Sequence, residues 1–102
     1  MRFEIRWKTG LDPALVAMAR SRLTLGLARL SHRVRKIVLW RELRAELGVE
    51  APHWVVRVEF DDGHHLVVTT PDPGAEPEAA GHVGDRVARA VDRDLLLPGA
   101  VR

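Results

Sequence analysis

The spacing of apolar residues along this chain switches between a period of two and a period of about 3.6 in an order that few folds share. A period of two is typical of a strand with one buried face, and a period of 3.6 is typical of an amphipathic helix. From the N-terminus, the pattern predicts one strand, a long helix, three strands and a final helix. We therefore expect an α+β domain of order βαβββα, with a four-stranded sheet and both helices packed on one of its faces.

The first strand and the first helix are separated by a clear boundary. Charged and apolar residues alternate over residues 2–8, and Asp12 followed by Pro13 is typical of an N-cap and a first helical position. We expect a helix of about five turns that ends near His32. Gly26 lies on its apolar side and is expected to allow a close approach of the sheet. That apolar side contains Leu15, Ala19, Leu23, Leu27 and Leu30.

Three strands follow in the middle of the chain. The second strand is expected over residues 35–43, but residues 41–47 are rich in helix formers and fit either its continuation or a short helix that ends at Gly48. Alternation predicts a third strand over residues 54–60 and a fourth over residues 65–70. Asp62-Gly63 between them favours a two-residue hairpin, which would place Phe60 opposite His65, Val58 opposite Val67 and Val56 opposite Thr69. The aromatic residues expected in the core are Phe3, Trp7, Trp54 and Phe60.

The last helix is expected to begin near Glu78, after a proline-rich loop over residues 71–78, and to end before Pro98-Gly99. Its buried side should contain Ala80, Val83, Val87, Val91 and Leu95. The length of 102 residues fits one domain, which we place at residues 1–97, followed by a short tail at 98–102. There is no cysteine and no apolar segment typical of a signal peptide or a membrane span, so we expect a cytoplasmic protein.

Basic residues are concentrated in the first half of the chain. Residues 1–45 contain eleven Lys or Arg against three acidic residues, whereas residues 46–102 contain five against eleven. Such an asymmetry favours binding of a polyanion by the first half, although arginine-rich composition and a solvated surface explain the same count.

Six arginines fall at helical spacing on the two predicted helices, and these are the candidate RNA-binding residues. If both helices cover the same face of the sheet, their arginine edges can border one groove. Guanidinium groups suit phosphate because they donate two parallel hydrogen bonds. The competing interpretation is that the arginines pair with Asp85, Asp92 and Asp94 and only keep the helices soluble. The six residues are Arg22, Arg29 and Arg33 of the first helix and Arg86, Arg89 and Arg93 of the last.

The sheet face away from the helices offers a different function, a protein-interaction or homodimerisation module. An open apolar patch of this kind often marks an interface. Trp40 in that patch is also able to stack on an unpaired base. The alternative is that residues 44–52 fold back over the patch. The possible interface residues are Val38, Trp40, Val55, Leu66 and Val68.

Nothing in the chain favours an enzyme. His64 and His65 are adjacent and point to opposite faces if they lie on a strand, so they cannot bind one metal ion together. Asp61-Asp62 is accounted for by turn geometry. The chain contains no nucleophile elbow and no phosphate-binding glycine loop. We expect no catalytic residue, no metal and no cofactor.

Three segments resemble the family of ribosome hibernation-promoting factors and ribosome-associated translation inhibitors, in its short stand-alone form. They are residues 27–34 (LARLSHRV), 36–39 (KIVL) and 85–91 (DRVARAV), and the similarity of pattern extends over residues 1–95. The resemblance implies a fold like that of double-stranded-RNA-binding domains with an added first strand. It also implies binding to RNA of the small ribosomal subunit and inhibition of translation during stress or stationary phase. Arg29, Arg33, Arg86, Arg89 and Arg93 match basic family positions that face ribosomal RNA.

Overall fold

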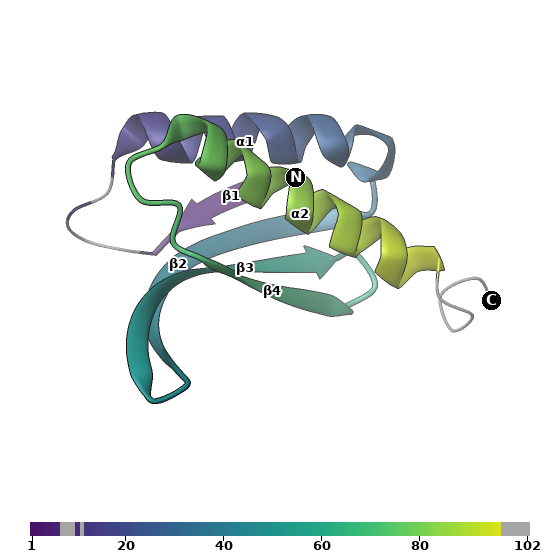
Figure 1. Cartoon of the computed structure of the whole chain (residues 1–102). Coiled ribbons are helices and arrows are strands. Elements are labelled where there is room, and N and C mark those ends of the chain that lie inside the picture. Colours follow the sequence, from purple (N-terminus) through teal and green to yellow (C-terminus); the bar gives the residue numbers. More distant parts are fainter. Residues whose placement is uncertain (7–9, 11, 97–102) are drawn as a thin grey trace.

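The computed structural model describes residues 1–6, 10 and 12–96, and it has the predicted α+β architecture and element order. Both helices lie over one face of a mixed four-stranded sheet (Figure 1). The elements are β1 (Arg2–Ile5), α1 (Pro13–Gly26), the 3-10 helix η1 (Ala28–Leu30), β2 (Val34–Glu46), β3 (Val49–Phe60), β4 (His65–Pro71) and α2 (Pro77–Leu96). The predictions for Trp7 and for the tail at 98–102 lie outside the described residues.

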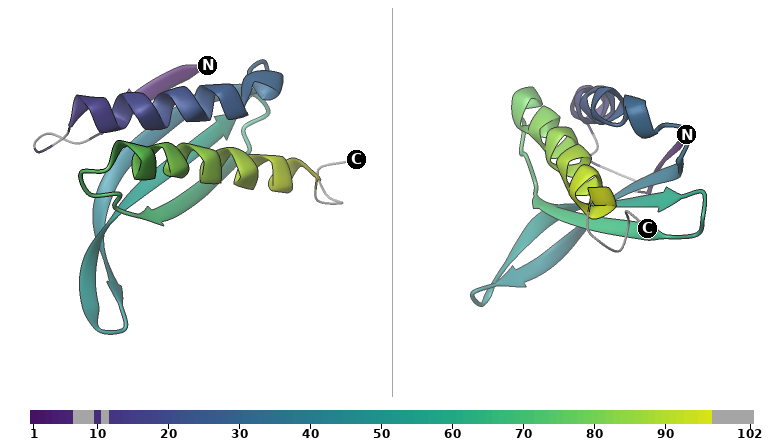
Figure 2. Two further views of the ribbon diagram at one scale, coloured as in Figure 1. Left: turned by 45° about the horizontal axis from the view of Figure 1, so that its top comes forward. Right: turned by 90° about the vertical axis from the view of Figure 1, so that its right-hand side faces the viewer.

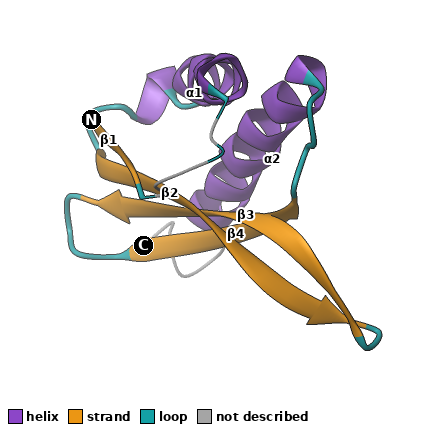
Figure 3. Cartoon of the chain, turned by 90° about the vertical axis from the view of Figure 1, so that its left-hand side faces the viewer, coloured by secondary structure: helices purple, strands orange, loops and turns teal. Residues whose placement is uncertain are grey.

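The strands follow one another across the sheet in the order β1-β2-β3-β4 (Figure 3). β1 runs parallel to β2, with Phe3 opposite Ile37, because α1 reverses the direction of the chain between them. The β2–β3 and β3–β4 pairs are antiparallel and are joined by short turns.

The first helix begins as predicted and ends earlier than predicted. Asp12 is the N-cap, and its Oδ1 accepts a hydrogen bond of 2.9 Å from the N–H of Ala14. The α-helix ends at Gly26 and does not reach His32. Leu27 has φ −103° and ψ 8°, outside the α-helical region, and the chain continues as one turn of 3-10 helix.

The core lies between the helices and the face of the sheet that they cover. Leu15, Ala19, Leu23 and Leu27 of the first helical segment are buried as predicted, and Leu30 is half-buried. Trp54 and Phe60 are also in the core, and Phe3 packs against its edge. The side chain of Leu95 is outside the described part of the chain. α2 contributes Ala80, Val83, Val87, Ala88 and Val91.

The two helices are in close contact at small residues. A Cβ atom at Gly26 would lie 2.4 Å from the Cβ of Ala88, and one at Gly84 would lie 2.5 Å from the carbonyl oxygen of Ala19. The prediction that Gly26 makes room for the sheet was wrong, because the neighbour of Gly26 is α2. Since the helices approach so closely, no groove separates them at these positions.

Residues 41–46 continue β2 as a strand, and the alternative of a short helix was wrong. They pair with residues 49–54 of β3, and this backbone pairing outweighs the helix propensity of Glu, Leu, Ala and Arg. Leu47 and Gly48 form the turn with φ of 54° and 80°. The two strands form a long hairpin arm, residues 41–52, that extends beyond the helical layer (Figure 2).

The β3–β4 hairpin has a register one residue away from the predicted one. Glu59, not Phe60, lies opposite His65, Val58 lies opposite Leu66, and Val56 lies opposite Val68. The N–H of Phe60 donates to the carbonyl of His64, so the loop is longer than the predicted two-residue turn. Because side chains alternate between faces, this shift turns every side chain of β4 to the opposite face.

Candidate nucleic-acid interface

The six predicted arginines do not border one groove. Arg22 of α1 and Arg29 of η1 each pair with an aspartate of α2. The Arg22–Asp85 nitrogen–oxygen distance is 3.1 Å and the Arg29–Asp92 distance is 3.3 Å. These four side chains therefore bridge the two helices, and pairs this exposed contribute about 0–1 kcal/mol to stability.

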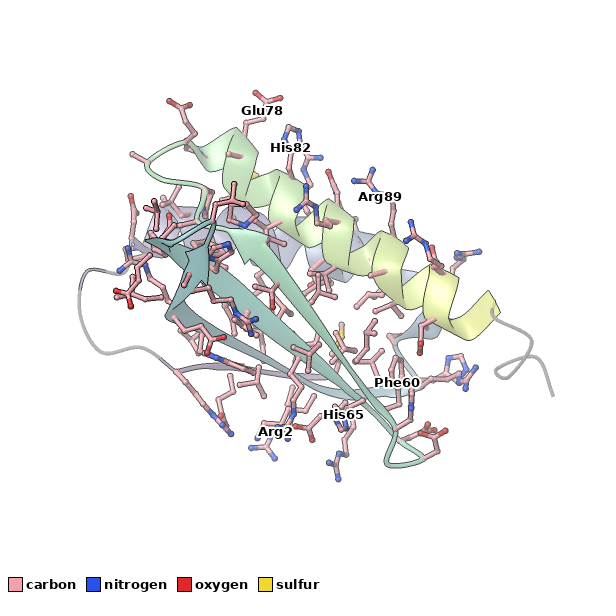
Figure 4. All side chains as sticks on the ribbon, turned by 60° about the horizontal axis from the view of Figure 1, so that its bottom comes forward. Arg2, Phe60, His65, Glu78, His82 and Arg89 are labelled. Atoms are coloured by element: carbon pink, nitrogen blue, oxygen red, sulfur yellow. The ribbon has the colours of Figure 1, made fainter. Side chains whose placement is uncertain are left out.

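Arg86, Arg89 and Arg93 lie on a different side of α2. Asp85, Ala88 and Asp92 face α1, and an α-helix turns by about 100° per residue, so the three arginines point outward. Figure 4 shows Arg89 on the side of the helix turned away from the sheet, in line with His82 and Glu78. All three arginine side chains are exposed. Within the described residues, none of them has an ion pair or a side-chain hydrogen bond.

A groove of about 600 Å³ lies between the outer side of α2 and the segment that follows β4. Its basic wall is formed by Arg86 and Arg89 of α2. The carboxylate in the groove, Asp72, accepts a 2.8 Å hydrogen bond from Nε of Arg41 and a 2.7 Å bond from the N–H of Gly74. The charge of Asp72 is therefore balanced by Arg41, and the two arginines of α2 give the groove a positive potential. The remaining lining residues are Thr70, Pro71, Pro73, Ala79, His82 and Val83.

Arg33 lies apart from both groups, in the connection between η1 and β2. Its backbone carbonyl accepts a 2.9 Å hydrogen bond from the N–H of Asp61 at the β3–β4 turn. Its side chain is half-buried. The structure thus brings Arg86, Arg89 and Arg93 together, pairs Arg22 and Arg29 with aspartates, and leaves Arg33 in the connection between η1 and β2.

The open face of the sheet does not carry the apolar patch that the sequence predicts. Leu66 and Val68 are on the helix-facing side, where they pack against the core, because the β4 register differs from the predicted one. Val38 and Val55 are on the open face but only 1% exposed. Trp40 is half-buried, and its indole N–H donates to Glu42 at 3.3 Å. The hairpin arm, which contains residues 44–52, bends to the side of the sheet opposite the helices (Figure 1).

Charged side chains occupy that face instead, and of these the sequence reasoning placed only Arg6, Arg57 and Glu59 there. Arg2, Lys36, Glu59 and His65 form one row across all four strands. The signal was the alternation within β1 and β3. Residues 2 and 4 of β1 and residues 57 and 59 of β3 are all charged, and in each strand they alternate with residues that face the core. Further charged residues of this face include Glu4, Arg6, Arg35 and Arg57.

Two glutamates, Glu59 and Glu4, form ion pairs with the neighbouring basic side chains of this face. Glu59 accepts hydrogen bonds of 2.7 Å from Arg35 and from Arg57. These bonds lower the pKa of Glu59 from its usual value, with the larger effect from Arg35. Arg6 and Lys36 likewise lower the pKa of Glu4, with the larger effect from Arg6. Most cations of the open face are thus engaged with carboxylates, in contrast to the arginines on the outer side of α2.

Comparison with known proteins gives no family assignment. Neither protein-family models nor curated proteins contain a match to this chain. Within residues 1–6, 10 and 12–96, no helix combines the length and the apolar character needed to cross a membrane.

Proposed function

We propose that this protein binds structured RNA of the small ribosomal subunit through the outer side of α2 and inhibits translation by occupying its site. The observation that carries the proposal is the row of Arg86, Arg89 and Arg93. These guanidinium groups are exposed and have no ion pair among the described residues. Guanidinium groups in this state are ready to donate paired hydrogen bonds to phosphate.

The shape of the site supports a polymeric ligand. Arg86 and Arg93 are seven residues apart on α2, a rise of about 10 Å along the helix axis, so the row is long enough to contact more than one phosphate group. The groove beside Arg86 and Arg89 gives an unpaired nucleotide a place to lie. The resemblance of residues 27–34 and 85–91 to the hibernation-factor family favours ribosomal RNA, in the cytoplasm during stress or stationary phase.

Two matched double variants test the proposal. Arg86→Gln with Arg89→Gln removes two of the unpaired charges, and Arg22→Gln with Arg29→Gln removes two of the paired ones. The assay is binding of the full chain to purified small ribosomal subunits at several salt concentrations. We expect the first variant to bind weakly, and the second to bind nearly as well as the unmodified protein.

The salt dependence gives a quantitative expectation. Each phosphate contact adds about −0.9 to the slope of log affinity against log salt, so three contacts predict a loss of about fortyfold between 50 and 200 mM salt. With Arg86 and Arg89 replaced, one contact remains and the loss falls to about fourfold. Equal binding by the two double variants, or affinity that does not change with salt, refutes the proposed surface.

A further inference from the structure

The outer edge of β2 in the hairpin arm has no strand partner among residues 1–6, 10 and 12–96. The N–H of Arg6 donates to the carbonyl of Leu39 at 2.8 Å, so the backbone groups of Leu39 point toward β1. Backbone groups of alternate residues on a strand point to the same edge, so those of Leu43 and Ala45 also point outward. The pairing with β1 ends at Leu39. Among the described residues, no strand pairs with this edge beyond that point.

The opposite edge of the arm is blocked. Pro52 of β3 has no N–H, and its carbonyl accepts a 3.1 Å hydrogen bond from the N–H of Asp72. Proline is one of the residues by which proteins prevent edge-to-edge pairing. On the β2 edge, residues 41–46 contain neither proline nor lysine, and Leu43 is 65% exposed. The β2 edge of the arm lacks this proline block.

The side chains along this edge are complementary to a second copy of themselves. Antiparallel pairing about a two-fold axis at Leu43 places Leu43 beside Leu43 of the second copy, and Glu42 beside Arg44 of that copy. Glu42 and Arg44 already form an ion pair of 2.7 Å within the chain. Their equivalents in the second copy complete a square of alternating charges.

Other registers are less suitable. An axis at Arg44 would allow hydrogen bonds between Leu43 of each copy and Ala45 of the other, but it places two copies of Arg44 directly opposite one another, and like charges in that position are destabilising. An axis at Arg41 requires the carbonyl of Leu39, which already accepts from Arg6. An axis at Leu43 pairs residues 41–45 in full before the turn at Leu47.

We propose that two copies of this chain form a dimer by antiparallel pairing of the β2 edges of their arms, centred on Leu43. In this register residues 41–45 of one copy pair with residues 45–41 of the other. This is consistent with the arm's extension beyond the helices (Figures 1 and 2). The proposed pairing uses backbone groups of residues 41–45 and does not involve the side chains of Arg86, Arg89 or Arg93.

The test is the mass of the full-length protein in solution as a function of its concentration, by sedimentation velocity. Leu43→Lys should weaken dimerisation at least tenfold. Val49→Lys is the matched control, because Val49 is also an exposed residue of the arm, at 66%, but its backbone groups point toward β2. It should dimerise like the unmodified protein. A protein that is monomeric at every concentration, or equal weakening by both substitutions, refutes the proposal.

An exchange of charges tests the register without reference to folding. Glu42→Arg and Arg44→Glu, each alone, place like charges together across the axis and should not dimerise. An equimolar mixture of the two variants places opposite charges together and should form a heterodimer. Since neither variant has its own Glu42–Arg44 pair, rescue on mixing comes only from contacts between chains. No association in the mixture, with an unmodified protein that is dimeric, overturns the Leu43-centred pairing.

Discussion

Replacing Gly26 by alanine is expected to destabilise the protein through the contact between α1 and α2. The new Cβ would lie 2.4 Å from the Cβ of Ala88, whereas two carbon atoms pack at about 3.5–4.0 Å. The helices must therefore separate by about 1 Å, and overpacking of this kind costs about 1–3 kcal/mol. Alanine recovers up to about 1 kcal/mol through its higher helix propensity. We expect a net loss of about 1–2 kcal/mol in the free energy of unfolding, or roughly 4–16 °C in Tm.

The assay is urea unfolding followed by circular dichroism, on Gly26→Ala, on Ala88→Gly and on the double variant. Ala88→Gly alone should cost about 1 kcal/mol, because glycine is unfavourable inside a helix. In the double variant the clash is absent, so Gly26→Ala should cost much less than it does beside Ala88. The coupling between the two sites should be about 1–2 kcal/mol. If Gly26→Ala has the same effect in both backgrounds, the close packing of the helices is refuted.

Two further substitutions test the arm and the open face of the sheet. Leu47→Asn should raise the free energy of unfolding by about 1 kcal/mol, because Leu47 is fully exposed with φ of 54° and asparagine tolerates this left-handed conformation better; an unchanged urea midpoint contradicts that turn. Glu59→Gln should reduce the dependence of stability on acid pH. Arg35 and Arg57 lower the pKa of Glu59, so the carboxylate stabilises the fold at neutral pH and this contribution is lost as the pH falls below about 4.5 toward the folded-state value. Urea midpoints at pH 7 and pH 3 should therefore differ less for the variant than for the unmodified protein, and equal differences are evidence against the ion pairs.

The β3–β4 hairpin shows why the pattern of apolar residues did not determine every face. Both alternations within residues 65–70 contain apolar side chains, so Leu66 with Val68 and Val67 with Thr69 fit the buried side about equally well. The loop decides between them. The carboxylate of Asp62 accepts a 2.9 Å hydrogen bond from the N–H of His64, which lengthens the turn and moves the register by one residue.

The sequence predicted the row of arginines in the candidate site but not the direction in which the row faces. Helical spacing correctly places Arg86, Arg89 and Arg93 on one side of α2. It gives no information about how far α2 is rotated about its own axis relative to α1. That rotation depends on which small residues meet at the helix contact, here Gly84 and Ala88. The spacing of charges within one helix therefore predicts a row, and only tertiary packing determines which row faces solvent.

Because β1 pairs in parallel with β2, we expect it to be the last strand to join the sheet. β2, β3 and β4 are connected by tight turns, so their contacts form between residues that are close in sequence. Arg2 pairs with Lys36, and closing this long segment loses more chain entropy than closing a turn. β1 also has only four residues, and Phe3 packs at the margin of the core. Its amide protons should therefore exchange with solvent through local opening of the N-terminal strand, while those of β2 and β3 in the centre of the sheet exchange only when the whole domain unfolds.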